Sequence, residues 1–248
     1  MIASIGEARL KDGVCRGLAL TLAVQAAEKG SSVAMLGPVS TDKEGGAVLE
    51  FLVDHWVMFD PDLAQNPLPS DQVLESLTEE GLQNALKVNS DIRLAYVGGI
   101  ALTGSCGGAI LSALHGYEPR PILMMEPAES TEDGSRLMKL LKGCDLVKLT
   151  EKELRLLGPD DPLELCLEQV GKRLGVRDLW VHENGRNRWW NEEGWVVELP
   201  ASGNPEKESG TVCAVLHEQG CFGNDGQNPG YHVSRQAVVK ALEACREA

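Results

Sequence analysis

The feature that most constrains the fold is a regular alternation of short apolar runs with helical patterns. Aliphatic runs of about five residues are typical of buried strands. Such runs lie at residues 1–6, 32–36, 94–97, 121–125, 145–149 and 178–182. The stretches between them predict helices, at residues 17–29, 44–53, 78–87, 163–174 and 234–246 among others. Strands that alternate with helices of this length form right-handed βαβ units. The sequence therefore predicts one α/β domain over residues 1–248, a three-layer α/β/α fold with a mostly parallel central sheet.

Local signals predict where some elements begin. Thr78 precedes two glutamates and a helical pattern, which is typical of a helix N-cap. Thr150 and Glu153 have the spacing of a capping box. The Pro-rich stretch 59–70 predicts a loop.

The segment 187–199 differs from the rest of the chain. It contains two β-rich pieces around Glu193-Gly194 and predicts an antiparallel hairpin. Three of the five tryptophans lie there, at positions 189, 190 and 195. They either cover the core or form a contact surface, and the sequence leaves both interpretations open.

Charge and cysteine content exclude several functional classes. The chain has 248 residues and a formal net charge of −14, and such an acidic surface disfavours general binding to nucleic acids or anionic membranes. No apolar run reaches the roughly 20 residues that span a bilayer, and the first residues do not resemble a signal peptide. The seven cysteines are irregularly spaced and form no CxxC pair, so we expect reduced, mostly buried thiols in a cytoplasmic protein.

Ligands of open α/β sheets bind at the carboxyl ends of the strands. In this chain those ends carry the segments GPVSTD, GGIALTG, EPAEST, LTEKE and HENGRN. The sequence contains no Walker A motif and no GxSxG motif, and its five histidines lack the spacing of metal ligands. The glycine-rich stretch 98–108 fits either the approach of a phosphate or the close packing of a helix on a strand.

Several segments resemble the PfkB (ribokinase-like) family of carbohydrate kinases. GPVSTDKEG at 37–45 resembles the family motif G-x-V-G-x-D-x-x-G, with Asp42 and Gly45 matching and Ser40 in place of the internal glycine. The early substrate-side motif has its counterpart in DGVCRGLA, where Gly13 is retained. The resemblance implies that Gly13, Asp42 and Gly45 contact the sugar.

The nucleotide side of the resemblance lies in the second half of the chain. VKLTEKEL resembles the family's N-x-x-E segment, with Glu153 matching and Thr150 replacing the asparagine. LWVHENGR resembles the strand and turn that border the nucleotide, with Gly185 as the matching glycine. The resemblance implies that Glu153 and Gly185 lie near ATP, and that Glu153 contacts Mg²⁺ indirectly.

The phosphoryl-transfer motif departs most from the family. SGNPEKE at 202–208 replaces D-x-x-G-A-G-D, whose glycine amides bind the transferred phosphate and whose last aspartate is the base. The glycine positions become Pro205, Glu206 and Lys207, and the base becomes Glu208. Proline has no N–H, and losing one such donor costs roughly 3 kcal/mol of transition-state stabilisation. Lys207 would compensate in part by binding the phosphate.

Two main hypotheses follow from this resemblance. In the first, the chain is a carbohydrate kinase, a transferase that uses ATP and Mg²⁺ to phosphorylate a sugar or nucleoside-like substrate. In the second, it is a pseudoenzyme, a catalytically impaired ribokinase-like protein that binds a ligand or a partner. The family's lid over the sugar is reduced or absent here, which would leave a sheet edge free for a homodimer. An unrelated α/β protein is the third alternative, because a fold alone does not determine function.

Overall fold

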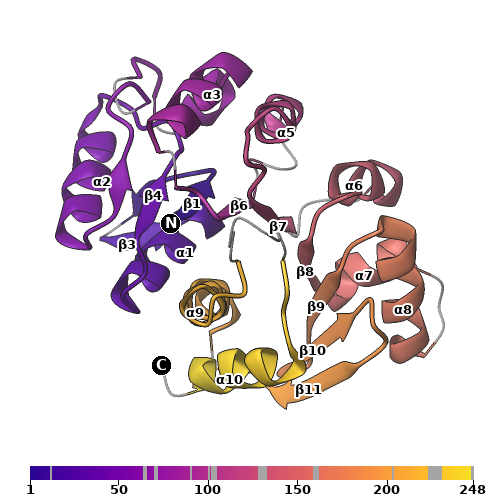
Figure 1. The fold of residues 1–248 in the computed structure, drawn as a ribbon. Coiled ribbons are helices and arrows are strands. Elements are labelled where there is room, and N and C mark those ends of the chain that lie inside the picture. The colour runs from indigo at the N-terminus through magenta and orange to yellow at the C-terminus, as the bar shows by residue number, and fades with distance from the viewer. Residues whose placement is uncertain are drawn as a thin grey trace.

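The computed structural model describes residues 1–11, 13–63, 66–69, 72–89, 91–99, 101, 105–127, 133–158, 162–202, 204–222 and 231–246. Within them, one nine-stranded sheet forms the centre of the molecule (Figure 1). Its strands are β1 (Ile2–Ile5), β4 (Val33–Met35), β5 (Met58–Phe59), β6 (Leu94–Gly99), β7 (Ile122–Pro127), β8 (Leu146–Thr150), β9 (Asp178–Glu183), β10 (Arg186–Asn191) and β11 (Val196–Pro200). They lie in the order β11-β10-β9-β8-β7-β6-β1-β4-β5. The strands from β5 to β9 are parallel, and β10 and β11 add antiparallel pairs.

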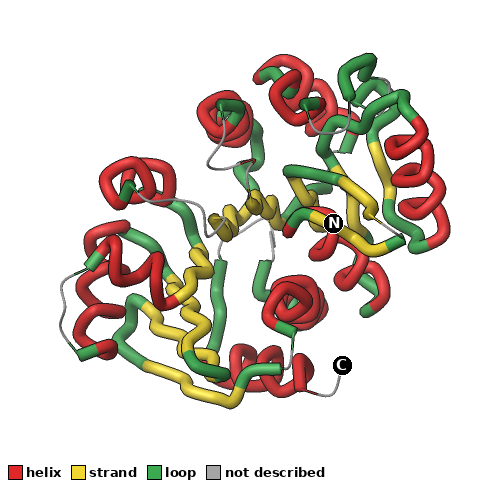
Figure 2. The backbone as a smooth tube through the Cα atoms, turned by 180° about the vertical axis from the view of Figure 1, so that it is seen from behind, coloured by secondary structure: helices red, strands yellow, loops and turns green. Residues whose placement is uncertain are grey.

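Helices cover both faces of this sheet, as Figure 2 shows from behind. They are α1 (Leu18–Glu28), α2 (Lys43–Asp54), α3 (Glu79–Val88), α5 (Gly107–His115), α6 (Gly134–Leu141), α7 (Glu151–Leu157), α8 (Leu163–Leu174), α9 (Pro205–Glu218) and α10 (Arg235–Arg246), with a short 3-10 turn at Val73–Ser76. Buried side chains of α3, α5, α6, α7 and α8 pack on one face, and those of α1, α2, α9 and α10 pack on the other. The predicted three-layer α/β/α architecture is confirmed.

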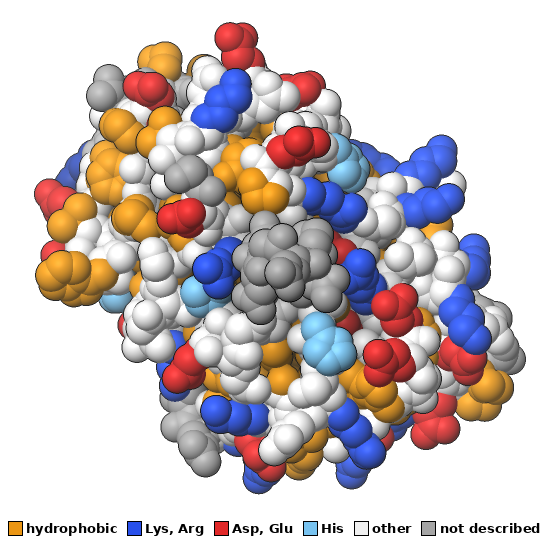
Figure 3. Space-filling model, in the orientation of Figure 1, with side chains coloured by type: hydrophobic (Ala, Val, Ile, Leu, Met, Phe, Trp, Pro, Cys, Tyr) orange, Lys and Arg blue, Asp and Glu red, His pale blue; other side chains and the backbone are white. Residues whose placement is uncertain are grey.

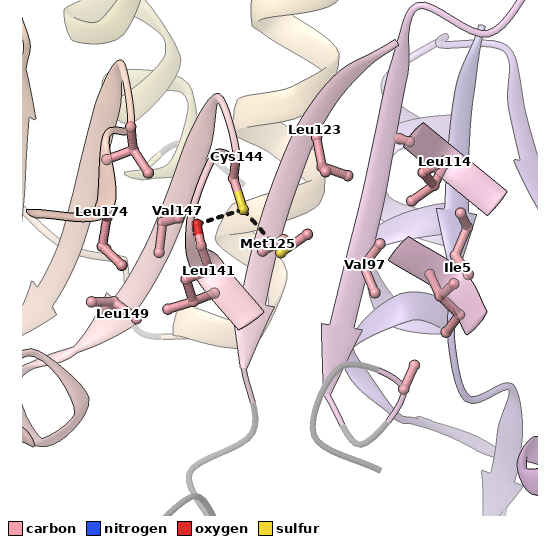
Figure 4. Packing of buried hydrophobic residues seen from close by; sticks show 14 of the residues in the cluster. Ile5, Val97, Leu114, Leu123, Met125, Leu141, Cys144, Val147, Leu149 and Leu174 are labelled. Carbon is pink, nitrogen blue, oxygen red and sulfur yellow. Dashed lines mark hydrogen bonds between the residues drawn. The ribbon is translucent and has the colours of Figure 1, made fainter. Parts of the chain in front are cut away.

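The core follows the alternation of side chains along each strand. In β1, Ala3 and Ile5 face one helical layer while Ile2 faces the other. Figure 4 shows part of the first layer, where the Cys144 thiol lies 3.0 Å from the Met125 sulfur. Each central strand therefore buries both of its faces, which explains why the strands are apolar throughout.

One hairpin extends the parallel part of the sheet beyond β9. The predicted hairpin at 187–199 is confirmed as β10 and β11, and Trp189 is buried and stacks on Trp180. The tryptophans at 189 and 190 are buried, which supports the core-covering interpretation for those two.

A second hairpin was missed by the sequence prediction. It consists of β2 (Arg9–Lys11) and β3 (Val14–Arg16), which pair antiparallel after β1. This pair is the one two-stranded sheet within the described ranges, and the reduction of the family's lid stays a prediction.

Several local predictions are confirmed. Thr78 caps α3 through its hydroxyl, and Thr150 and Glu153 form a reciprocal capping box at the start of α7. The cysteines with described side chains, at positions 106, 144, 166, 213, 221 and 245, are buried thiols outside any disulfide bond. Among the helices of the described residues, none combines the length and the apolar character that crossing a membrane requires.

Candidate functional site

A buried polar cluster lies under the first turns of α9, on three neighbouring strands of the sheet. The Lys148 ammonium on β8 lies 2.8 Å from the Glu126 carboxylate on β7, and it donates to the Ser209 hydroxyl of α9 over 2.8 Å. Ser209 and the Tyr96 hydroxyl of β6 both donate to Glu126, over 2.6 and 2.9 Å. Lys148 also lies over the Trp180 ring. The cluster joins α9 to the sheet, and pairing leaves neither of its buried charges uncompensated.

Glu208, the predicted base, is buried beside this cluster. Its carboxylate accepts a hydrogen bond from the Ser202 backbone N–H over 2.6 Å, and His182 Nδ1 of β9 lies 3.7 Å from it. Burial alone would raise the pKa of Glu208, but contacts with His182, Ser202 and Asn187 and the charge of Lys148 outweigh it and lower the pKa. Glu208 is thus ionised at neutral pH, and its carboxylate links the Ser202 backbone to the first turn of α9.

The first turn of α9 has few backbone donors to offer a ligand. Pro205 occupies the first helical position and lacks an N–H. The Lys207 N–H donates to the Asn204 carbonyl over 3.2 Å, and the Ser202 N–H is taken by Glu208. These contacts occupy amides that would have to be free to bind a phosphate.

A pocket of about 420 Å³ lies beside this turn, between α1, α9 and α10. Its lining combines two cations, Lys207 and Arg246, with the carboxylate of Glu208 and with hydroxyl and amide groups. The lining residues are Gln25, Ala201, Ser202, Asn204, Lys207, Glu208, Thr211, Cys245 and Arg246. The Lys207 side chain, which the family resemblance predicted to bind phosphate, is exposed at this pocket. Such a lining fits a polar ligand that carries negative charge.

Glu153 and Gly185 lie at the same edge of the sheet as Glu208. Glu153 is buried, and its carboxylate accepts from the Thr150 N–H and hydroxyl over 2.8 and 2.9 Å. Thr150 is paired with His182 across β8 and β9. Gly185 lies in the turn between β9 and β10, with φ of 73°. The structure thus places Glu153, Gly185, Lys207 and Glu208 at one edge of the sheet, where His182 lies between Thr150 and Glu208.

Gly13 lies on the β2–β3 hairpin, and Asp42 and Gly45 lie at the start of α2. Gly13 lies in the turn of the β2–β3 hairpin, with φ of 74°, and faces open space. Asp42 caps α2 by accepting from the Gly45 N–H over 2.8 Å. A Cβ on Gly45 would lie 1.9 Å from the Ser40 carbonyl oxygen, so packing explains this glycine. The strand β4, which precedes Asp42, lies four strand positions from β8, which precedes Glu153, a spacing of roughly 19 Å across the sheet.

The glycine-rich stretch 98–108 is described in part. A Cβ on Gly98 would lie 2.4 Å from the Tyr96 hydroxyl, which supports close packing at that residue. Residues 100 and 102–104 of the stretch lie outside the described ranges. Nowhere in the described ranges do three or more His, Cys, Asp or Glu side chains come together as a metal site would require.

Sequence reasoning missed His182, Lys148 and Glu126. The one available signal was a charged residue, Lys148, inside an apolar strand, since a lysine buried on a strand needs a partner. Its partner Glu126 follows another apolar run, but the pairing of the two strands was not visible in the sequence.

Comparison with known proteins supports the fold. The chain is similar to the solved structure of fructokinase from Xylella fastidiosa, with a TM-score of 0.77 and 16% identity over 99% of this chain and 90% of that one. It is also similar to a ribokinase II from E. coli in complex with ATP and Mg²⁺, with a TM-score of 0.73 and 15% identity over 99% and 91% of the two chains. Aminoimidazole riboside kinase from Salmonella enterica gives a TM-score of 0.74 and 12% identity over 99% and 90%.

These likenesses extend over almost the whole chain, so it has the ribokinase-like fold. No family model matches the sequence, and no curated protein matches it. The resemblance read from the sequence is therefore confirmed at the level of the fold, which is that of sugar and nucleoside kinases.

Proposed function

We propose that this chain is a ribokinase-like ligand-binding protein in which phosphoryl transfer is impaired. The observation that carries the proposal is the first turn of α9, where Pro205 lacks an N–H, the Lys207 N–H bonds to Asn204 and the Ser202 N–H bonds to Glu208. Phosphoryl transfer depends on donors preorganised around the migrating charge. This turn does not fit the phosphate chain of ATP in that role.

The proposed ligand is a small, polar, anionic molecule such as a phosphorylated sugar or nucleoside. Lys207 and Arg246 supply positive charge to the pocket beside α9, and Ser202, Asn204 and Thr211 supply hydrogen-bonding groups. A volume of about 420 Å³ is within the range of small-molecule sites. The Salmonella enterica neighbour was solved with aminoimidazole riboside and an ATP analogue, which suggests the class of molecules to test.

The test is a thermal-stability titration with sugars, nucleosides, their phosphates, and ATP or ADP with Mg²⁺. A ligand at 100 times its dissociation constant adds about 2.7 kcal/mol of stability. Lys207→Ala and Arg246→Ala should each weaken binding of the phosphorylated ligands. Lys240→Ala, on α10 but outside the pocket lining, is the matched control and should leave binding unchanged.

A second candidate function is ATP-dependent phosphorylation of a sugar or nucleoside-like hydroxyl, with Mg²⁺. It is favoured by the ionised carboxylate of Glu208, which has the charge state of a general base at neutral pH. ADP release in the presence of a hydroxyl acceptor separates the two candidates. Turnover at ordinary kinase rates that Glu208→Gln abolishes would replace the first proposal with the second. Ligand binding without ADP release would support the first.

A further inference from the structure

Trp56 is the most exposed large apolar side chain of the described residues, with 89% of its surface accessible. Its indole ring makes no hydrogen bond or ring contact with another described residue. Val53 and Met58 beside it are 61% and 45% exposed. Figure 3 shows hydrophobic side chains gathered on the left of the molecule, over α2. These residues therefore form an apolar patch at the end of α2.

The backbone at Trp56 is left-handed, with φ of 57°. The residue lies just after the C-cap of α2, where the Trp56 N–H bonds to the Val53 carbonyl and the Val57 N–H to the Leu52 carbonyl. This pattern is a Schellman motif, whose left-handed position normally holds glycine. A bulky side chain is strained there, so the fold itself does not require tryptophan at this position.

A shallow pocket of about 400 Å³ lies on the last turns of α2, which Trp56 follows closely in the chain. The aliphatic side chains of Leu49 and Val53 and the carboxylates of Glu50 and Asp54 line it. Within the described ranges neither carboxylate makes an ion pair. An indole ring fits such a lining, because its carbon atoms suit an apolar floor and its N–H suits a carboxylate.

We propose that this patch is the interface of a homodimer in which Trp56 of each copy fills the α2 pocket of the other. Trp56 and the α2 pocket belong to the same end of α2. A two-fold axis at this surface therefore places the Trp56 of each copy in the pocket of the other copy. The patch also adjoins β5, the outermost strand of the sheet, whose free edge adds a surface for self-pairing.

The size of the patch sets the expected affinity. A standard interface buries about 800 Å² on each partner, and one tryptophan supplies about 150–250 Å² of it. Two copies that each have a formal net charge of −14 also repel one another. We therefore expect a weak dimer that forms in the micromolar range and is strengthened by added salt.

The test is sedimentation equilibrium from low micromolar to submillimolar protein. The wild type should dimerise over this range, and Trp56→Ala should raise the dissociation constant roughly 30-fold or more, as loss of an interface anchor does. Val53→Arg, on the pocket floor, should have the same effect. Val88→Ala removes another highly exposed apolar side chain, at the end of α3, and should change nothing.

A second measurement separates the interface role from a folding role. At dilutions where every variant is monomeric, Trp56→Gly should raise Tm by about 2–4 °C because glycine suits the left-handed position. The same variant should abolish dimerisation. A wild type that stays monomeric throughout, or a dimer that Trp56→Ala leaves intact, overturns the proposal. Neither outcome bears on ligand binding at α9.

Discussion

The ammonium group of Lys148 lies 2.8 Å from a carboxylate oxygen of Glu126, and both side chains are buried. The pair joins β7 to β8 and, through Ser209, holds the start of α9 against the sheet. The contribution of this pair to the free energy of unfolding is best judged by removing one partner. A buried carboxylate without its cation costs far more than the pair itself contributes.

Lys148→Met should therefore lower the free energy of unfolding by about 3–5 kcal/mol, because Glu126 would remain charged and uncompensated. Urea unfolding at neutral pH measures the change. Lys172→Met is the matched control, since Lys172 pairs with Glu168 on the exposed face of α8. Such a surface pair contributes about 0.5 kcal/mol or less. Equal losses in the two variants would contradict the role assigned to Lys148.

Two neighbouring glycines of α2 should respond in opposite ways to alanine. A Cβ on Gly45 would lie 1.9 Å from the Ser40 carbonyl oxygen, whereas a Cβ on Gly46 meets nothing within 4 Å. We expect Gly45→Ala to destabilise the fold by about 2–3 kcal/mol through overpacking. Gly46→Ala should stabilise it by about 0.5–1 kcal/mol, because alanine favours the helix. Thermal unfolding of both variants measures these stability changes. A Gly45→Ala variant as stable as the wild type would mean that α2 can shift away from Ser40.

Much of the fold was predictable because its signals are local. The capping box of Thr150 and Glu153 involves residues three positions apart, and the predicted strands and helices follow periodic patterns in short windows. The β2–β3 hairpin carried the local signal Asp12-Gly13, a dipeptide typical of two-residue hairpin turns, which the prediction did not use. Its strands are three residues long, too short for an alternation pattern to stand out.

The candidate site was harder to predict because its contacts span the sequence. Ser209 bonds to Lys148 and Glu126, which are 61 and 83 positions away. The order of strands decides which side chains meet, and nothing within a single segment encodes that order. The family resemblance located Glu208 but could not reveal that its carboxylate is turned to Ser202 and His182.

Glu208→Gln should destabilise the protein by about 1–3 kcal/mol at pH 7, because it removes a charge that is hydrogen-bonded and buried. The pKa of Glu208 is lowered in the folded state, so its stabilising contribution is present above the ordinary glutamate pKa. That contribution is lost as the pH falls through the folded-state value. In urea unfolding, the difference in free energy of unfolding between wild type and variant should therefore decrease towards acid pH. A difference that stays constant with pH would contradict stabilisation by the ionised Glu208 carboxylate.

Asp178 should show the opposite pH dependence. Its side chain is fully buried, and although Trp189 and Asn191 donate to it over 2.5 and 3.0 Å, burial raises its pKa to about 6. A raised pKa means that folding favours the protonated acid. The stabilising contribution of Asp178 is therefore present below the ordinary aspartate pKa of 3.8 and is lost as the pH rises through about 6.

Asp178→Asn keeps an oxygen that can accept from Trp189 and removes the titration. Relative to wild type, the variant should gain stability between pH 4 and pH 8, by up to about 3 kcal/mol at 1.36 kcal/mol per pH unit. Urea unfolding at several pH values measures this trend. The control is Asp145→Asn, which changes a partly exposed carboxylate that pairs with Arg120 and Arg177. If the difference between wild type and Asp178→Asn did not grow with pH, Asp178 would be ionised throughout that range, and the donors around it would outweigh its burial.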